Sequence, residues 1–566
     1  MLTFSFSMES IKQQNTDYHG PHNNALQVGA NNIPNPTFLD LKRAWEHVHK
    51  SLPSWLQINK ATWEKELRAC TDFQQFQSNK LFPNTKDTYK LRKLMEGLVI
   101  GPVDKNTNEL SFCCPCLYQQ AWDKAYNTEA GYENINPTPF HKKPKDLHHY
   151  GYELNDGSDG NDTQGSLNDL LKHWHRIYKI KHWNEYAPYN MKGDFNLPYI
   201  LFKAKNITDH QTRVAKWNKT RPIAPQTKHP MKKLFHLTGK AWSFITMNLP
   251  DEHFVLNHGG KLTQFVQEAN RTLGNCGRMR TTIRDIEGCF PNMPKEIIAQ
   301  SAIKFTHDIT KDKGYDSVYV PARGNKPCRW HTKARTGYKK IPFHTLIDVL
   351  QFALNNTIIK DNDGNLHKQV KGIPMGDPHS PGMTICACAW MEQEWLATLD
   401  KRTKTYFRAK RYMDDIFMIY VENDNFDHKN FLQDFDKSEC YLPPLKLEEA
   451  NPDTFLEMTF EIHNNSIRYW LKNDNIPLQP PKIWRYAHFR SHMSFQMKKG
   501  MLSAVMKKIH KMASDDRALY HSALQKIHEF LNLHYPKKMI WTTCTTMGVI
   551  TRNATWFDVR DALSDM

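Results

Sequence analysis

Residues 411–420 constrain the fold more than any other stretch of the sequence. They read Arg-Tyr-Met-Asp-Asp-Ile-Phe-Met-Ile-Tyr, so Asp414 and Asp415 stand between apolar residues rich in Ile and aromatics. This pattern predicts a strand, a tight turn that carries the two carboxylates, and a second strand. Adjacent carboxylates inside apolar walls repel each other unless a cation or open water compensates them. A solvent-exposed Asp-Asp turn is the alternative that this segment alone leaves open.

A second segment, residues 282–294, places Asp285 at the end of a short strand. A loop and a helix start follow, and Pro294 suits the first turn of a helix. Phosphoryl transfer by two divalent ions about 3.5–4 Å apart needs carboxylates from at least two strands. Asp285 and the pair Asp414–Asp415 meet this need if their strands are neighbours in one antiparallel sheet.

A glycine-rich segment, residues 371–381, lies between the two carboxylate segments. It contains Gly372, Met375 and Gly376, and it opens into a helix of small residues from Gly382 to about residue 399. Glycine lets a backbone approach a base pair or a template closely. An ordinary turn before a helix would also explain each glycine.

Length and charge indicate a multi-unit protein with polyanionic partners. The 566 residues exceed a single core, so we expect two to four packed units. The balance of 76 Lys and Arg against 59 Asp and Glu gives +17, which favours nucleic acid as a partner, although charge also serves solubility. The sequence shows no secretory signal and no apolar run near the roughly 20 residues of a membrane span. We therefore expect a soluble, intracellular protein without a membrane partner.

Cysteine usage leaves one ambiguous cluster. Cys113, Cys114 and Cys116 invite a zinc site, but structural zinc sites usually draw ligand pairs from two places, and no second pair lies nearby. We favour a buried strand over residues 110–115. The 11 cysteines form no disulfide framework, which is typical of a reducing setting.

The patterns divide the chain into five regions, and the last of them is helical and basic. The regions are a disordered N-terminus 1–36, a helical extension 37–96, a region 97–240 with two strands around residues 104–108 and a flexible loop 152–165, a region 241–470 of alternating strands and helices with a basic insertion 305–340, and a helical region 471–566. In the last region two apolar stripes predict helices, with Ser514 as the cap of the second. The stripes are Leu502, Val505, Ile509, Met512 and Tyr520, Leu524, Ile527, Leu531.

The order Asp-x4-aromatic, Gly-x3-Gly-x3-Ser-Pro and Tyr-Met-Asp-Asp resembles the palm motifs of reverse transcriptases. Residues 285–294 are further similar to the Penelope-like retroelement enzymes, which are related to telomerase. So are the segments 375–381, 455–460, 488–492 and 535–536, and the resemblance spans about residues 97–540. We find no GIY-YIG nuclease, ribonuclease H or integrase pattern.

The resemblance implies an α+β right-hand polymerase with an antiparallel palm sheet, fingers from the region 97–240 and a helical thumb from 471–566. The implied activity is RNA-directed DNA synthesis from a primer 3′-hydroxyl, with two Mg²⁺ ions and Mn²⁺ as a possible substitute. Its partners would be an RNA template, a DNA or RNA primer and deoxynucleoside triphosphates. The rival is a non-catalytic nucleic-acid-binding remnant, which has no need to keep three carboxylates in a basic cleft.

The resemblance also assigns roles to residues. Asp285 and Asp414 would ligate both ions, with Asp415 nearby. The residues expected at the nucleotide are Lys203, Lys205, Arg221, Phe290, Gly372, Met375 and Gly376. The residues expected at primer and template are Tyr412, Met413, Phe455, Leu456, Lys498, Lys507 and Lys508. The sequence departs from the family pattern at two positions in the segment expected to position the nucleotide, with Lys371 for Gln and Asp377 for a small Ser.

Phe290 carries the sharpest prediction, because it stands five residues after Asp285, where these enzymes carry an aromatic residue under the sugar. A ring there would exclude a 2′-hydroxyl and select deoxynucleotides. A plain core anchor is the alternative. We also predict that residues 305–340 bind nucleic-acid backbone, because their Lys and Arg residues alternate with Tyr319, Trp330 and Tyr338; an exposed basic insertion would show the same pattern.

Overall fold

A computed structural model describes residues 96–104, 106–135, 167–195, 197–203, 220–250, 252–324, 326–331, 336–450, 453–473, 485–489 and 493–565, with isolated residues before them. The predicted region 1–36, nearly all of 37–96, the loop 152–165 and Lys205 lie outside the described residues. The chain forms two compact units. Unit 1 comprises residues 1–121, 201–221 and 470–566, and unit 2 comprises 122–200 and 222–469.

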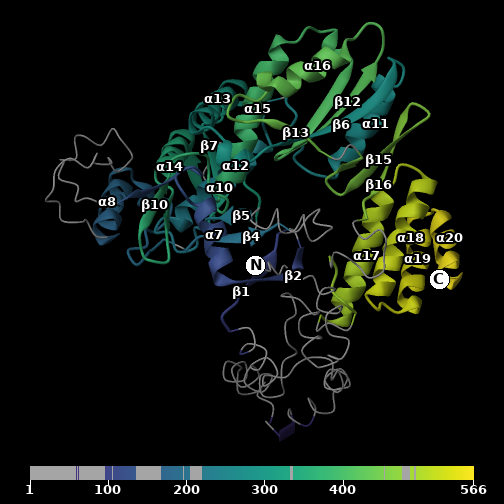
Figure 1. The fold of residues 1–566 in the computed structure, drawn as a ribbon, viewed down its shortest axis with the longest axis horizontal. Helices are drawn as coiled ribbons and strands as arrows, with labels where there is room; N and C mark the ends of the chain where they lie inside the picture. Colours follow the sequence, from purple (N-terminus) through teal and green to yellow (C-terminus); the bar gives the residue numbers. More distant parts are fainter. Residues whose placement is uncertain are drawn as a thin grey trace. The chain divides into compact units, whose positions relative to one another are not determined.

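A four-stranded antiparallel sheet is the centre of unit 2 (Figure 1). Its strands are β11 (Phe407–Tyr412), β12 (Asp415–Glu422), β6 (Arg278–Ile286) and β13 (Leu447–Glu449), in that order across the sheet. The predicted strand, turn and strand at the paired carboxylates are confirmed. Alternating β-branched and aromatic residues explain this, because they pack well on a pleated surface.

One apolar core joins a face of this sheet to four long helices. They are α10 (Lys232–Thr246), α13 (Lys295–Lys313), α14 (Phe343–Asn355) and α15 (Ser380–Thr398). Ile416 and Met418 of β12 share their core with Cys386 of α15, all fully or almost fully buried. The small residues of α15 allow close packing, since each leaves room for a neighbouring side chain.

The other face of β12 carries Phe417, because successive side chains of a strand point to opposite sides. Phe417 stacks on Phe455 and Phe460, with ring centroids 5.4 and 4.5 Å away. These two rings belong to the sheet β14 (Thr454–Phe455), β15 (Met458–His463) and β16 (Ser466–Leu471). Helix α11 (Lys261–Leu273) adds Phe265 to the same cluster.

Unit 2 has further elements outside the main sheet. They are β3 (Tyr132–Ile135), β9 (Ile358–Lys360) and β10 (Leu366–Gln369) in one sheet, β7 (Ser317–Pro321) with β8 (Tyr338–Pro342), helices α8 (Leu167–Ile180), α12 (Cys289–Asn292) and α16 (His428–Asp434), the π-helix η5 (Phe435–Glu439), and the 3-10 turns η3 (Trp183–Glu185) and η4 (Thr403–Thr405). The elements around α8 share a second apolar core with α14.

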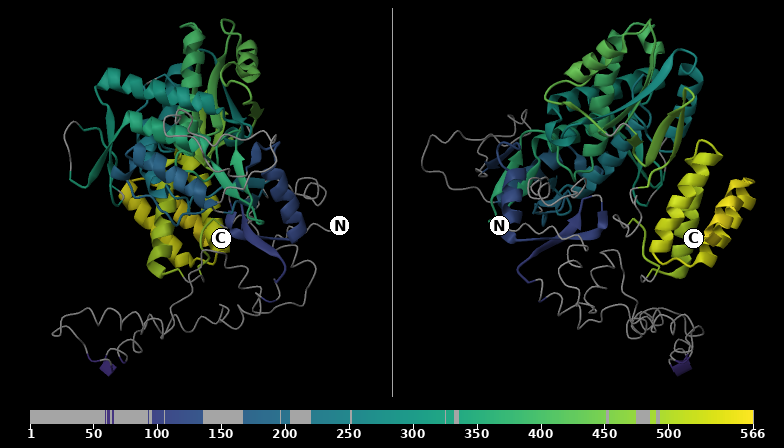
Figure 2. Two further views of the ribbon diagram at one scale, coloured as in Figure 1. Left: turned by 90° about the vertical axis from the view of Figure 1, so that its left-hand side faces the viewer. Right: turned by 45° about the vertical axis from the view of Figure 1, so that its right-hand side comes forward.

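Unit 1 contains β1 (Val99–Val103) paired with β2 (Asn106–Cys113), and a helical bundle of α17 (Phe495–Lys511), α18 (Asp516–Asn532), α19 (Lys537–Thr551) and α20 (Thr555–Asp565) (Figure 2). The predicted strand pair near residues 97–118 is confirmed. Helix α7 (Pro115–Ala125) and strands β4 (Tyr199–Phe202) and β5 (Thr220–Ile223) run across the unit boundaries.

Only one of the two helical stripes is predicted correctly. Leu502, Val505 and Ile509 of α17 are buried, as expected. In α18 the buried stripe is Leu519, Ala523, Ile527 and Phe530. Ile527 is therefore buried as expected, Leu524 and Leu531 are only partly buried against the same core, and Tyr520 is exposed. The predicted cap is also wrong by one residue: the Asp515 side chain accepts from Ala518 N at 2.9 Å. An ionised carboxylate is the stronger partner for the positive helix start.

No helix in the described part of the chain is long and apolar enough to cross a membrane.

Candidate active site

The sheet register brings the two carboxylate segments together. Asp415 of β12 lies directly opposite Asp285 of β6, and Ile286 N donates to the Asp414 carbonyl at 3.0 Å. Directly paired residues of an antiparallel sheet share a face, so Asp285 and Asp415 lie on the face away from the helical layer. Asp285, Asp414 and Asp415 are all half-buried.

A strained two-residue turn presents Asp414 and Asp415. Tyr412 pairs with Asp415 across the turn, and Met413 has a φ of 59°. A long side chain rarely adopts this left-handed conformation unless its surroundings enforce it. The enforcing contact is Arg411 Nη1, which donates to the Met413 carbonyl at 2.8 Å. Arg411 therefore holds the turn from beneath.

Arg411 is fully buried and pairs with the equally buried Glu392 of α15. The Glu392 carboxylate also accepts from Tyr441 Oη at 2.7 Å and from Phe254 N at 2.8 Å. Burial alone would lower the pKa of Arg411, but the Glu392 carboxylate raises it well above its ordinary value. The guanidinium beneath the turn is thus a fixed positive charge.

Sequence reasoning did not single out Glu392, although a signal exists. Glu392 follows Cys388 by four residues and precedes Leu396 by four, and both neighbours are buried. A carboxylate on the apolar stripe of a helix predicts a buried partner, because residues four apart share a helix face.

Glu448 was also not singled out. It is exposed on β13 and lies directly opposite Asp285, on the side away from Asp415. Three carboxylates thus stand in a row across β12, β6 and β13. Like charges directly opposite one another destabilise a sheet, so the row favours a cation. The three-residue strand has no periodic pattern that would reveal it in the sequence.

The donor set fits Mg²⁺ in chemistry and backbone position. Carboxylate oxygens are hard ligands, and Mg²⁺ usually takes one or two protein carboxylates together with substrate phosphates. Within the described residues, no three His, Cys, Asp or Glu side chains form a group that could hold a metal by themselves. Asp285, Asp414 and Asp415 would hold such an ion together with a nucleotide, so the metal roles of these residues stay predictions.

The glycine loop lies against the segment that follows Asp285. Ile373 N donates to the Phe290 carbonyl at 2.9 Å. Gly372 has a φ of +68°, and a Cβ there would overlap the Pro291 carbonyl and lie 2.7 Å from Phe290 O. Only glycine fits such an approach. Phe290 is half-buried and packs against the main core, which is compatible with both the gate and the anchor.

Met375 and Gly376 contact the segment around Ala224. Ala224 N donates to the Met375 carbonyl at 2.8 Å, and a Cβ on Gly376 would lie 2.5 Å from Ala224 O. Gly372 and Gly376 therefore allow the loop backbone to approach two different segments closely, the first at Pro291 and the second at Ala224. Lys371, the first departure from the family pattern, is exposed.

Two of the three predicted triphosphate cations, Lys203 and Arg221, lie in unit 1. Arg221 on β5 forms an ion pair with Asp104, with 2.8 Å between Nε and Oδ1. Binding of a triphosphate would require Arg221 to exchange this carboxylate. Lys203 is exposed, and Lys205 lies outside the described residues.

Two of the predicted primer and template residues are buried. Lys498 is 6% exposed, its Nζ lies 5.3 Å from the Phe489 ring centroid, and burial lowers its pKa. Phe455 is 1% exposed, inside the aromatic cluster with Phe417. Neither side chain is therefore placed to touch a duplex. The residues with accessible side chains are the exposed Tyr412 and Lys507 and the half-buried Met413, Leu456 and Lys508.

One of the three rings of residues 305–340 predicted to stack on bases is buried. Tyr319 is buried, and the half-buried Trp330 stacks on Tyr315 at 5.3 Å, whereas the half-buried Tyr338 keeps part of its side chain accessible. The basic part stands as a prediction, because Arg323, Lys326 and Arg329 are exposed. The segment is the end of α13 with a β-hairpin.

The cysteine cluster is a strand end followed by a helix start. Residues 106–113 form β2 as expected, but Cys114 and Cys116 are exposed, contrary to the predicted burial. Their Sγ atoms lie 2.9 Å apart. Cys114 and Cys116 follow the end of the strand at Cys113, where the side chains are no longer covered by strand pairing.

Comparisons with known proteins agree with this geometry. No family model and no curated protein matches the sequence. Among solved structures, telomerase from Candida albicans with a TWJ fragment of telomeric RNA matches with a TM-score of 0.53 at 12% identity, over 95% of this chain and 78% of that chain. The chain has a right-hand polymerase fold.

Two further solved structures match at lower TM-scores. Apo telomerase from Candida tropicalis gives 0.47 at 11% identity, over 99% of this chain and 85% of that chain. The Sicinivirus 3Dpol RNA-dependent RNA polymerase gives 0.36 at 12% identity, over 71% and 74% of the two chains. The antiparallel sheet of unit 2 and the match to the Candida albicans telomerase confirm the predicted α+β class with an antiparallel palm sheet.

Proposed function

We propose that this protein is an RNA-directed DNA polymerase that extends a primer 3′-hydroxyl at Asp285, Asp414 and Asp415. The observation that carries the proposal is the register that sets Asp415 opposite Asp285 above a buried cation, Arg411. Carboxylates that repel each other at an exposed sheet face have a physical use only where cations bind. Divalent ions bound there would stabilise charge on the transferring phosphate and activate the primer hydroxyl.

The protein's own part is positioning. The Arg411 contact fixes the Met413 carbonyl, so the turn enters the reaction already in its final shape. Gly372 and Ile373 hold the Phe290 backbone, and the Phe290 ring would then pack under the sugar of the incoming nucleotide. A ring in that place excludes the 2′-hydroxyl by size, which supports deoxynucleotides as the substrate class.

The net charge of the chain and its similarity to a solved telomerase support RNA as the template. The chain carries +17, and Lys507 on α17 is exposed. The similar telomerase from Candida albicans was solved with telomeric RNA. A Penelope-like retroelement origin belongs to the same proposal. Two segments that resemble that group, 488–492 and 535–536, pack on each other, since the Phe489 ring lies edge-on to Tyr535.

Primer extension by the purified full chain tests the proposal. Asp285→Asn and Asp414→Asn should abolish extension on an RNA template with deoxynucleotides and leave the circular dichroism spectrum unchanged, because loss of carboxylate repulsion does not weaken the fold. Asp363→Asn is the matched control, since Asp363 is an exposed carboxylate in the hairpin turn between β9 and β10.

Metal dependence provides a second readout. Manganese binding, followed by water proton relaxation in the presence of a deoxynucleotide, should weaken in Asp285→Asn and not in Asp363→Asn. Extension by both Asn variants at the wild-type rate would refute the catalytic assignment. RNA binding without any extension by the wild type would identify a non-catalytic remnant.

A further inference from the structure

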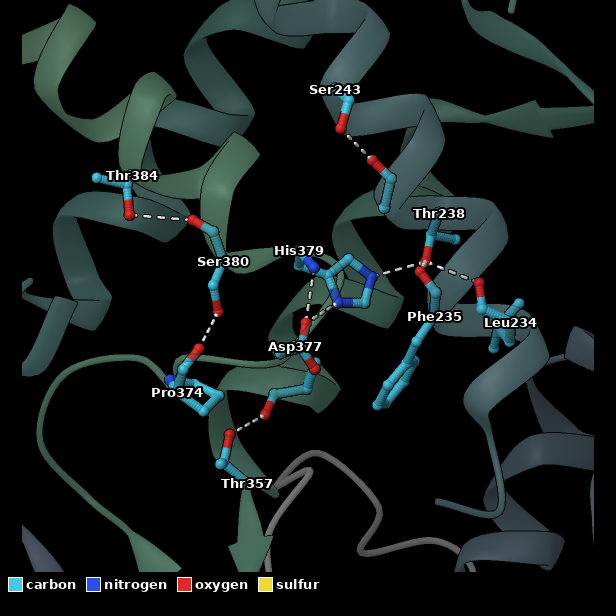
Figure 3. Close-up of polar contacts among 12 residues, drawn as sticks. Leu234, Phe235, Thr238, Ser243, Thr357, Pro374, Asp377, His379, Ser380 and Thr384 are labelled. Carbon is cyan, nitrogen blue, oxygen red and sulfur yellow. Dashed lines mark hydrogen bonds and ion pairs between the residues drawn. The ribbon is translucent and has the colours of Figure 1, made fainter. Parts of the chain in front are cut away.

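A buried hydrogen-bonded relay joins the end of the glycine loop to helix α10. Asp377 and His379 are 8% and 3% exposed. The Asp377 Oδ1 atom accepts from His379 N and from His379 Nδ1, both at 2.7 Å. On the far side of the ring, His379 Nε2 lies 2.7 Å from Thr238 Oγ1 (Figure 3). Both ring nitrogens have partners, so the ring cannot turn without breaking the relay.

The charge of Asp377 fits its place in the relay. Burial alone would raise the pKa of Asp377, but the His379 charge and hydrogen bonds lower it below its ordinary value. Because the ionised Asp377 carboxylate can only accept, the hydrogen between it and the ring lies on His379 Nδ1. Thr238 Oγ1 also lies 3.0 Å from the Leu234 carbonyl, which ties the hydroxyl to its own helix. The loop is thereby anchored to the backbone of α10.

Helix α10 is shaped to receive this segment. Gly239 follows Thr238, and a Cβ there would lie 2.6 Å from the Pro378 carbonyl oxygen and 2.8 Å from Pro378 Cβ. The Phe235 ring stands edge-on to His379, with centroids 5.1 Å apart at 70°. Helix and loop thus meet at backbone distance beside the relay.

The other end of the loop reaches the expected nucleotide position. Ile373 N donates to Phe290 O at 2.9 Å, and Ser380 Oγ donates to Pro374 O at 2.7 Å. A cavity of about 10 Å³ lies under the loop, lined in part by Ile373, Asp377 and His379. This volume is no larger than one water molecule needs, so the loop is closely packed on its apolar side and its position depends on the contacts at its two ends.

We propose that Asp377, His379 and Thr238 are positioning residues that fix the 372–376 loop against Phe290 and so set nucleotide affinity and sugar selection. The inference rests on the proposed polymerase function and names the part of the fold that holds its nucleotide pocket. It also gives a structural reason for Asp377, which replaces the small Ser that the family resemblance implies.

Loss of the relay should weaken nucleotide binding more than turnover. A loop that is no longer tied to α10 holds Ile373 less firmly against Phe290, whereas the Asp285–Asp415 register is set by the pairing of β6 with β12. We expect KM for deoxynucleotides to rise about tenfold, the effect of losing one hydrogen bond in a charged network. Ribonucleotide discrimination should fall, and kcat at saturating nucleotide should stay within about twofold, because interactions that bind ground and transition states equally act on KM.

The experiment compares Thr238→Val, Thr238→Ser and Thr384→Val in the full chain. Thr238→Val removes the hydroxyl at similar volume, and Thr238→Ser keeps it. Thr384→Val is the control, because Thr384 is a buried residue of α15 whose hydroxyl donates to the Ser380 carbonyl of its own helix at 3.0 Å. KM and kcat are measured with deoxynucleotides and ribonucleotides, and hydrogen exchange is followed in peptides covering residues 371–379.

The expected result is a raised KM, weaker sugar discrimination and faster exchange in Thr238→Val alone. Equal behaviour of Thr238→Val and Thr384→Val would overturn the inference, and so would a fall in kcat at unchanged KM. A wild type that extends no primer would refute the proposed function and the nucleotide part of this inference together. The exchange comparison would then still decide whether the relay holds the loop.

Discussion

Replacement of Glu392 by leucine removes the partner of the buried cation beneath the carboxylate turn. Three groups lose their acceptor: the Arg411 guanidinium, the Tyr441 hydroxyl and the Phe254 amide. Both charged side chains are 0% exposed, so no water replaces the carboxylate. The variant therefore leaves an uncompensated charge and two orphaned donors inside the core.

The magnitude follows from these three contacts. Breaking a buried ion pair by removing one partner costs about 3–5 kcal/mol. Each buried donor left without an acceptor adds about 1–3 kcal/mol. The total is comparable with the free energy of unfolding of a typical domain, about 5–15 kcal/mol. We expect Glu392→Leu to be largely unfolded in unit 2.

The double variant Glu392→Leu, Arg411→Met separates stability from activity. Replacement of both charges by apolar side chains should restore about 3–5 kcal/mol relative to Glu392→Leu, because no unpaired charge remains. Extension should stay low, since the double variant has no Arg411 Nη1 to hold the Met413 carbonyl. Hydrogen exchange of peptides from β11, β12 and α15 measures local stability, and primer extension measures activity.

Two outcomes would refute this reasoning. A double variant as unstable as Glu392→Leu would show that the buried charge is not the source of the cost. Full wild-type extension by a stable double variant would show that Arg411 does not hold the turn. The isosteric Arg411→Met variant completes the cycle and measures the coupling between the two side chains.

Four other predictions concern separate parts of the protein. Phe290→Val should raise ribonucleotide incorporation more than it lowers deoxynucleotide incorporation if the ring is a sugar gate. Equal losses of both activities, with a cost of about 3–5 kcal/mol for Phe290→Ala in urea unfolding, would identify a core anchor. Gly372→Ala should abolish extension, since its Cβ overlaps Pro291 O. The control is Gly364→Ala, at a φ of +91° with open space around it, which should cost only about 1–2 kcal/mol in urea unfolding. Burial lowers the pKa of Lys295 to about 8 from the ordinary 10.5. Between these pH values the unfolded chain binds more protons than the folded chain, so the stability of the fold rises with pH across that window. The rise in melting temperature with pH should be smaller in Lys295→Met. Neutralising Arg323, Lys326 and Arg329 together should reduce the slope of log affinity for single-stranded RNA against log salt by about two, and an unchanged slope would reject this contact surface.

Local patterns in the sequence determined the elements that carry the site. The strand, turn and strand at residues 411–420 and the buried stripe of α17 follow from periods of two and 3.6 residues. The order of the motifs also indicated the right-hand polymerase fold that the structural comparison shows. These features depend on residues close in the chain, which is why they could be predicted.

Tertiary structure decided which of those residues meet. The register of Asp285 with Asp415, the row completed by Glu448 and the pairing of Arg411 with Glu392 join segments that are far apart in the chain. No local pattern encodes such pairs, because they depend on how strands align and helices pack.

The same holds for residues whose side chains turned inward. Lys498 and Trp330 have the sequence context of a nucleic-acid surface, yet Lys498 lies over Phe489 and Trp330 stacks on Tyr315. A long cationic stem or a large ring gains free energy wherever apolar surface is near. Which surface is near is set by the packing of whole elements, and the sequence of one segment does not contain that information.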